Sequence, residues 1–272
     1  MTRRSPRNPN GGGASRKAVV ASCEQSLRRL RTDYIDLYWL HVWDRFTPIE
    51  ETMRALDDLV RAGKVRYIGF SDTPAWKVAQ AQTIALFRGW APLVALQIEY
   101  SLLERTVEGE LMPMARELGL GVTPWSPLAG GVLSGKFRRE DAASATSDRG
   151  ARALSRLTER TFTILDEVAR VAAALGTTPA AVALAWVQSR PGVASTIIGA
   201  RRLDQFDANL AALDLALPAH HVEALNAVSA PVLNFPAPFL AGATSFMHNG
   251  LTVNGVPSEA LPLLQPSPHA VD

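Results

Sequence analysis

The sequence predicts an α/β protein of the (β/α)8 TIM-barrel type, in which about five strand–helix units are recognisable. Buried apolar runs alternate with segments whose apolar residues recur at helical spacing, and no hairpin signal joins successive runs. Such an alternation forms a parallel sheet through right-handed crossovers. A doubly wound dinucleotide-binding sheet would carry G-x-G-x-x-G after its first strand, but Gly11–Gly13 precedes a helix with no strand before it, which favours the barrel.

Capping and breaker residues give the approximate limits of each element. Ser15 stands in the position of an N-cap, Pro48 lies in the first turn of a helix, and Gly63 ends that helix. The expected helices span residues 15–30, 48–62, 75–87, 108–118, 158–175, 179–188 and 203–213. The expected strands span residues 33–41, 65–71, 93–101, 121–126 and 194–199.

We divide the chain into a flexible N-terminal loop (residues 1–14), a partial barrel (15–230) and an irregular C-terminal tail (231–272) rich in proline and glycine. Closure of the barrel needs eight strands, so five units predict an open, curved half-barrel. The strands at residues 33–41 and 194–199 would then each have an unpaired edge. Because unpaired edges bind other strands, we expect self-association through the exposed sheet edges.

Composition narrows the classes of partner. Lys and Arg total 28 against 26 Asp and Glu, and the resulting net charge of +2 predicts no nucleic-acid partner. No apolar run reaches the roughly 18 residues that span a bilayer, so no membrane partner is expected. The single cysteine, Cys23, excludes an internal disulfide and favours a cytoplasmic location. No cluster of His, Cys and carboxylates has metal-ligand spacing, so no metal is expected.

The active site of such a barrel lies at the carboxyl ends of its strands. The first expected strand ends at His41, and the second at Ser71 and Asp72. The third contributes Gln97, and the fourth ends at Trp125, before a run of small residues. The other candidate residues at these ends are Ser126, Pro127, Leu128, Gly130, Lys136, Gly199, Arg201, Gln205 and Asn209.

Four of these residues suit a nicotinamide ring. The indole of Trp125 offers a flat face on which the ring stacks. Ser71, Asp72 and Gln97 offer hydrogen bonds to its carboxamide.

Nine others suit phosphates and an adenine. Small residues over 126–131 let backbone N–H groups approach a pyrophosphate, and Lys136 supplies a positive charge. The run from Gly199 opens a helix whose N-terminus favours a phosphate, and Arg201 matches a 2′-phosphate bidentately. Gln205 and Asn209 lie i, i+4 on one face of that helix, within reach of an adenine.

These residues carry a resemblance to the aldo-keto reductase family. It covers about residues 14–230 in the family's order and spacing, and it most resembles the subgroup of aryl-alcohol dehydrogenase-like enzymes and potassium-channel β-subunits. The resemblance implies a (β/α)8 barrel, NADP(H), and a small carbonyl substrate, an aldehyde or ketone, that receives a hydride. The matching runs are Leu27-Arg-Arg-Leu-Arg-Thr-Asp-Tyr-Ile-Asp-Leu-Tyr-Trp-Leu-His41, Gly63-Lys-Val-Arg-Tyr-Ile-Gly-Phe-Ser71, Trp125-Ser-Pro-Leu-Ala-Gly-Gly131, and Ile198-Gly-Ala-Arg201 with Gln205 and Asn209.

The sequence also departs from the family pattern. Of the family's catalytic Asp, Tyr, Lys and His, only the histidine has a counterpart, His41, and Asp72 replaces an asparagine common in the family. One interpretation is an NADP-dependent oxidoreductase that reduces an aldehyde or ketone, or oxidises the alcohol, with lowered competence. A second is a non-catalytic NADP-binding or regulatory module. A third is a truncated chain whose true reading frame begins upstream of Met1.

Overall fold

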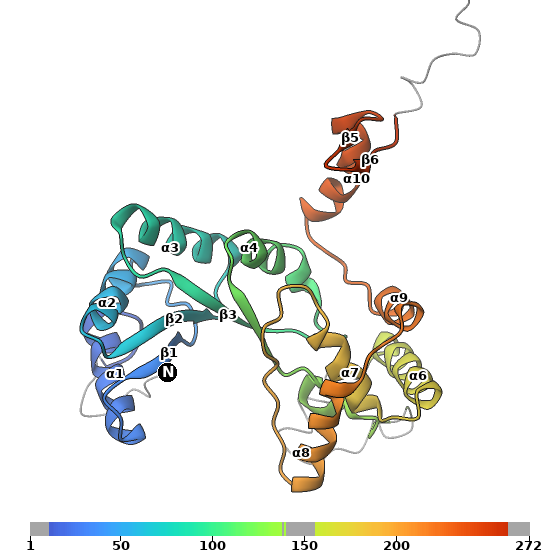
Figure 1. Cartoon of the computed structure of the whole chain (residues 1–272), viewed down its shortest axis with the longest axis horizontal. Coiled ribbons are helices and arrows are strands. Elements are labelled where there is room, and N and C mark those ends of the chain that lie inside the picture. Colours follow the sequence, from blue (N-terminus) through green and yellow to red (C-terminus); the bar gives the residue numbers. More distant parts are fainter. Residues whose placement is uncertain (1–10, 138, 140–155, 261–272) are drawn as a thin grey trace, which may run out of the picture. The chain divides into compact units, whose positions relative to one another are not determined.

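The computed structural model describes residues 11–137, 139 and 156–260, and the chain divides into two compact units, Met1–Pro231 and Val232–Asp272. The first unit contains a parallel sheet in the order β1-β2-β3-β4 that is not closed, as the sequence predicted (Figure 1). It is an incomplete barrel. Its strands are β1 (Ile35–Leu40), β2 (Val65–Ser71), β3 (Leu93–Glu99) and β4 (Gly121–Trp125).

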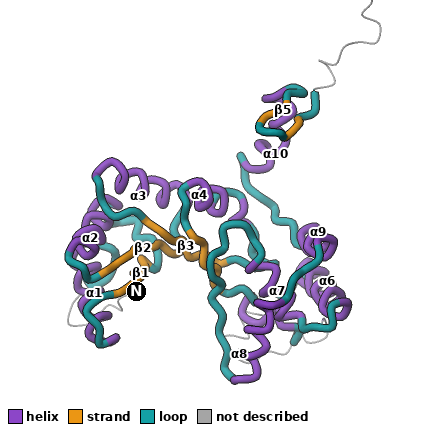
Figure 2. Tube along the Cα trace, in the orientation of Figure 1, coloured by secondary structure: helices purple, strands orange, loops and turns teal. Residues whose placement is uncertain are grey.

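Helices follow the strands in alternation, as Figure 2 shows. Local chemistry fixes several of their starts. The Ser15 hydroxyl accepts a hydrogen bond from Ala18 N, and Thr178 caps the helix that begins with Pro179. The α-helices of this unit are α1 (Arg16–Leu30), α2 (Ile49–Arg61), α3 (Ala75–Arg88), α4 (Leu111–Glu117), α6 (Glu159–Ala174), α7 (Pro179–Gln188), α8 (Leu203–Leu210) and α9 (Ala219–Val228). The described 3-10 helices are η1 (Thr106–Glu108), η2 (Ala129–Ser134) and η4 (Ala211–Asp214).

The two faces of the sheet differ in burial. On one face, the large apolar side chains Ile68, Phe70 and Leu96 are fully buried in the core that the helices cover. The alternate residues form the inner face, where Tyr67 is 59% exposed and Trp39 is half-buried. A Cβ at Gly69 would lie 2.6 Å from Trp39 Cζ3, so the indole of Trp39 lies against the backbone at Gly69. An open sheet leaves this face without the packed interior of a closed barrel.

The fifth expected strand, at residues 194–199, is not formed. Residues 192–197 run beside β4, but with one bridge, Val122 to Val193, and a bond from Ile197 N to Pro124 O of 2.8 Å. Pro124 has no N–H to donate, so the ladder cannot continue beyond Val122 in the regular pattern. The following helix is also shorter than expected, because it ends at Leu210 and continues as η4.

The prediction of an irregular tail was wrong for the described part of residues 231–272. Helix α10 (Ala237–His248) is followed by a hairpin of β5 (Thr252–Val253) and β6 (Val256–Pro257). Asn254 and Gly255 both have positive φ, which is the conformation that a two-residue hairpin turn requires. The Asn-Gly pair between two valines was the signal for this turn.

Within the described residues, no single helix is long and apolar enough to span a bilayer. Helices α6 and α7 together have the length and the apolar composition of a membrane-spanning segment. The chain bends by 98° between them.

A buried polar cluster joins β3, α7 and α9. Arg105 is 9% exposed and binds Glu108 through two parallel hydrogen bonds of 2.8 and 2.9 Å. Its guanidinium also donates to Ser229 Oγ and lies 5.0 Å from the centre of the Trp186 ring. Tyr100 donates to the same Glu108 carboxylate at 2.7 Å. Removal of the arginine would leave Glu108 partly buried without its cation.

We therefore expect Arg105→Ala to lower the free energy of unfolding by about 3–5 kcal/mol, since breaking a buried ion pair strands the remaining charge. Urea denaturation measures the change. Arg139→Ala is the matched control, because Arg139 is 47% exposed and its ion pair with Asp166 is worth at most about 1 kcal/mol. Equal losses in the two variants would contradict the role of the cluster.

Candidate functional site

Strand register brings several predicted site residues to one edge of the sheet. Leu40 pairs with Phe70, so His41 follows beside Ser71, and Ser71 pairs directly with Gln97. Glu99 pairs with Trp125, which ends β4 at the same edge. Ser71 is buried, Gln97 is half-buried, and His41 is exposed.

Asp72 and Trp125 meet across the end of β3. Trp125 Nε1 donates to Asp72 Oδ1 at 3.0 Å, and Ser71 Oγ donates to Asp72 Oδ2 at 3.2 Å. Asp72 has a φ of 45°, in the left-handed region that aspartate and asparagine tolerate better than most residues. Its backbone N–H still donates to Gln97 O at 3.1 Å. The half-buried indole is thus held by its edge at the end of the sheet.

The loop after Trp125 is a run of tight turns. Ser126, Ala129, Gly130 and Gly131 all have positive φ. Pro127 and Ala129 are buried, and Leu128 packs against the core, so these side chains hold the loop on the hydrophobic core. Backbone that turns in this way can present N–H groups to an anion.

The loop ends beside α7. A Cβ at Gly135 would lie 2.9 Å from Pro179 Cγ, so the turn at Gly135 is pressed against the start of that helix. The next residue, Lys136, is exposed.

The expected phosphate end of the site differs in detail from the sequence prediction. Helix α8 begins at Leu203, as expected, with Arg202 as its N-cap, so the run from Gly199 precedes the helix and does not form its first turn. Arg202 is bound to Asp204 through two hydrogen bonds, and Gln205 Oε1 accepts from Arg201 N at 3.2 Å. The side chain of Arg201 is exposed. The sequence did not predict the hydrogen bonds of Arg202 with Asp204 and of Gln205 with Arg201 N. Because Arg202 is already paired, Arg201 is the guanidinium of this pair that can bind a phosphate.

Asn209 lines a pocket of about 280 Å³. Leu184 and Gln188 of α7 form one wall, and Thr196 and Ile198 belong to the segment beside β4. Ile197 of that segment donates to Pro124 O at 2.8 Å, so the segment that lines the pocket runs beside the end of β4, where the loop after Trp125 begins. Asn209 itself is 8% exposed, and Gln205 is half-buried outside the pocket lining.

No tyrosine hydroxyl is available at this edge, and all four tyrosines lie in the described part of the chain. Tyr100 is 2% exposed and bound to Glu108, and burial raises the pKa of its phenol. Burial likewise raises the pKa of Tyr38 to about 12, and its hydroxyl donates to Val19 O. Tyr67 lies in the middle of β2, and Tyr34 precedes β1.

An aromatic cluster lies beside His41 and was not predicted. Trp43 and Trp76 contact edge to face, with ring centres 5.6 Å apart, and Lys77 Nζ lies 4.4 Å from the Trp76 ring centre. Trp76 is 58% exposed. The loop that carries Trp43 follows β1, and Trp76 lies in the first turn of α3 after Asp72, so both belong to the carboxyl edge of the sheet.

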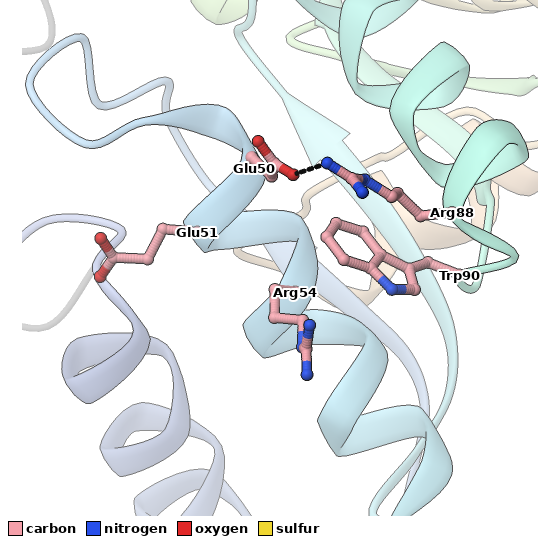
Figure 3. A pocket seen from close by; sticks show the side chains of 5 residues that line it. All are labelled: Glu50, Glu51, Arg54, Arg88 and Trp90. Atoms are coloured by element: carbon pink, nitrogen blue, oxygen red, sulfur yellow. Dashed lines mark hydrogen bonds and ion pairs between the residues drawn. The ribbon is translucent and has the colours of Figure 1, made fainter.

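A hollow of about 550 Å³ lies between α2 and α3, away from these residues. Figure 3 shows Glu50 and Arg88 joined across it, at 2.8 Å, with Trp90 next to them. None of the predicted site residues lines it. Glu50 and Arg88 already pair with each other, so we do not assign this hollow to the site.

Comparison with known proteins agrees with this arrangement. The model of the aldo/keto reductase family matches residues 3–230. The chain belongs to the aldo/keto reductase family. Members of this oxidoreductase family have a (β/α)8 barrel, and the resemblance predicted from the sequence is confirmed.

Relatives of the expected subgroup are among the matches. The chain is 40% identical over 236 residues to uncharacterized oxidoreductase YrpG of Bacillus subtilis (strain 168), covering 85% of this chain and 69% of that protein. It is 35% identical over 222 residues to the aryl-alcohol dehydrogenase (NADP+) of Phanerodontia chrysosporium, covering 79% and 57%. It is 35% identical over 233 residues to a "probable voltage-gated potassium channel subunit beta" of Oryza sativa subsp. japonica, covering 84% and 71%.

The loop beside His41 is held by Asp44. Its carboxylate accepts from Thr47 Oγ1 at 2.6 Å, from Ala14 N at 2.9 Å and from Phe46 N at 3.0 Å. These hydrogen bonds lower the pKa of Asp44, and the bond from Thr47 has the largest effect. Ala14 is thereby tied to the β1–α2 loop.

We expect Asp44→Asn to destabilise the protein by about 1 kcal/mol at pH 7, because hydrogen bonds to a carboxylate are stronger than those to an amide. The folded pKa lies below the unfolded one, so this contribution is complete above about pH 4 and is lost as the pH falls through the folded pKa. Chemical denaturation at a series of pH values measures it, with Asp207→Asn on the exposed face of α8 as control. A difference that does not shrink in acid would contradict this role.

Proposed function

We propose that this chain is an NADP(H)-dependent oxidoreductase acting on a carbonyl group or the corresponding alcohol. The Trp125–Asp72 contact carries the proposal, because it holds an indole face at the carboxyl edge of the sheet, directly before a loop of turned backbone. Trp125 would hold the nicotinamide ring, Ser71 and Gln97 its carboxamide, and the loop from Ser126 the pyrophosphate. NADPH supplies the hydride when bound.

The pocket at Asn209 and the exposed Arg201 supply the remaining contacts. Asn209 would bind the adenine in the pocket between α7 and η4, and Arg201 would bind the 2′-phosphate. Lys136 would offset charge on the pyrophosphate from the exposed end of the loop. A cytoplasmic location suits the single cysteine, Cys23, which is buried and unpaired.

The aromatic cluster favours an aromatic substrate. The exposed face of Trp76 and the adjoining Trp43 lie at the same edge as His41. Flat apolar groups pack well on such faces. The relative from Phanerodontia chrysosporium is named an aryl-alcohol dehydrogenase, which supports the same class of substrate for this chain.

A second candidate function is NADP(H) binding without turnover. The state of the tyrosines favours it, because the two hydroxyls nearest the core bind Glu108 and Val19 and none lies at the site edge. The relative from Oryza sativa subsp. japonica carries the name of a channel β-subunit, whereas the other relatives named above are enzymes. Binding and turnover measured separately distinguish the two candidates.

We expect NADP(H) to bind more tightly than NAD(H), and Arg201→Ala to remove most of that preference. Loss of one charged hydrogen-bonded contact to the 2′-phosphate corresponds to roughly a tenfold change in affinity. Quenching of tryptophan fluorescence during titration with both nucleotides measures it. Arg202→Ala is the control, since Arg202 already binds Asp204. Equal affinity of the wild-type chain for NADP(H) and NAD(H) would exclude the assignment of Arg201.

We expect reduction of nitrobenzaldehyde by residues 1–272 to be about 10²–10⁴-fold slower than ordinary enzymatic rates, because no tyrosine is placed to give its proton to the carbonyl oxygen. Loss of NADPH absorbance reports the rate. Turnover at ordinary rates that His41→Ala abolishes would show that another group supplies the proton.

A further inference from the structure

Asp72 places an unpaired negative charge at the edge of the indole on which the nicotinamide ring is proposed to stack. Its two oxygens accept from Trp125 Nε1 and Ser71 Oγ, which are both neutral donors. Among the described residues, no Lys, Arg or His nitrogen lies within 4.0 Å of this carboxylate. The side chain is exposed, so water screens the charge without removing it.

A nicotinamide ring carries one positive charge when oxidised and none when reduced. A fixed carboxylate beside the ring therefore attracts the oxidised form and leaves the reduced form nearly unaffected. We propose that Asp72 makes this site prefer NADP+ to NADPH. The inference rests on the proposed function, since it requires that the ring stack on Trp125.

This preference has a consequence for the direction of hydride transfer. In reduction, NADPH gives a hydride to the carbonyl carbon, the oxygen takes a proton, and NADP+ and the alcohol result. Tighter binding of NADP+ than of NADPH shifts this equilibrium on the protein toward NADP+ and the alcohol by the same factor, because binding and reaction are linked. Asp72 would thus make the bound cofactor a stronger hydride donor.

Asparagine is the substitution that isolates the charge. Asp72→Asn keeps the shape of the side chain and tolerates the φ of 45°. Its Oδ1 still accepts a hydrogen bond from Trp125 Nε1, so the indole keeps its support. Asp33→Asn removes an exposed aspartate at the opposite end of β1 and serves as the matched control.

The experiment titrates NADP+ and NADPH separately into the full chain and both variants, with tryptophan fluorescence as the readout. We expect Asp72→Asn to weaken NADP+ about fivefold, the effect of roughly 1 kcal/mol at a solvated site, while NADPH affinity changes less than twofold. The ratio of the two dissociation constants should be unchanged in Asp33→Asn.

Two results would overturn the inference alone. If both nucleotides bind but Asp72→Asn leaves both affinities unchanged, the charge has no influence on the ring. If both affinities fall equally, Asp72 acts only by supporting Trp125. If neither nucleotide binds the wild-type chain, the proposed function fails and the inference fails with it.

Discussion

The hydrogen bond from Trp125 Nε1 to Asp72 Oδ1 is the constraint on which the candidate site depends. It joins the ends of β2 and β4 across β3, so it exists only because the three strands are parallel and in this register. A slip of one residue in β4 would send the indole to the helix-covered face. The register of the sheet and this hydrogen bond therefore fix the position of the Trp125 indole. The loop of residues with positive φ begins directly after it, at Ser126.

Helices and strands whose ends are marked by apolar runs and capping residues could be predicted from the sequence. The segment beside Pro124, which lacks an N–H donor, and the short hairpin turn in the tail could not. The limits of β2 and of α7 agree with prediction because apolar runs and capping residues mark both ends. The segment after Gly192 has an apolar pattern typical of a strand, yet its neighbour offers a proline where the ladder needs an N–H. The hairpin at Asn254-Gly255 was missed because the abundant prolines and glycines outweighed one turn signal.

The candidate site divides in the same way. The strand-end rule placed Ser71, Gln97 and Trp125 at one edge, because parallel strands end together. It could not reveal the contact of Trp125 with Asp72, which requires a left-handed backbone at a non-glycine residue. Near α8, a short-range ion pair determines which arginine is free to bind a phosphate. Arg202 binds Asp204, two residues away, and the periodicity of the sequence does not predict this pairing.

Binding and turnover depend on different parts of this fold. Every group proposed to hold the nucleotide comes from β2, β3, β4 or the segments that follow β4. Proton transfer needs a hydroxyl or another acid beside His41, and Tyr100, the tyrosine that follows β3, is committed to the Arg105–Glu108 cluster. Release of that hydroxyl would break its hydrogen bond to Glu108. The interactions that stabilise the cluster beside α7 and α9 therefore also prevent Tyr100 from donating a proton to a substrate.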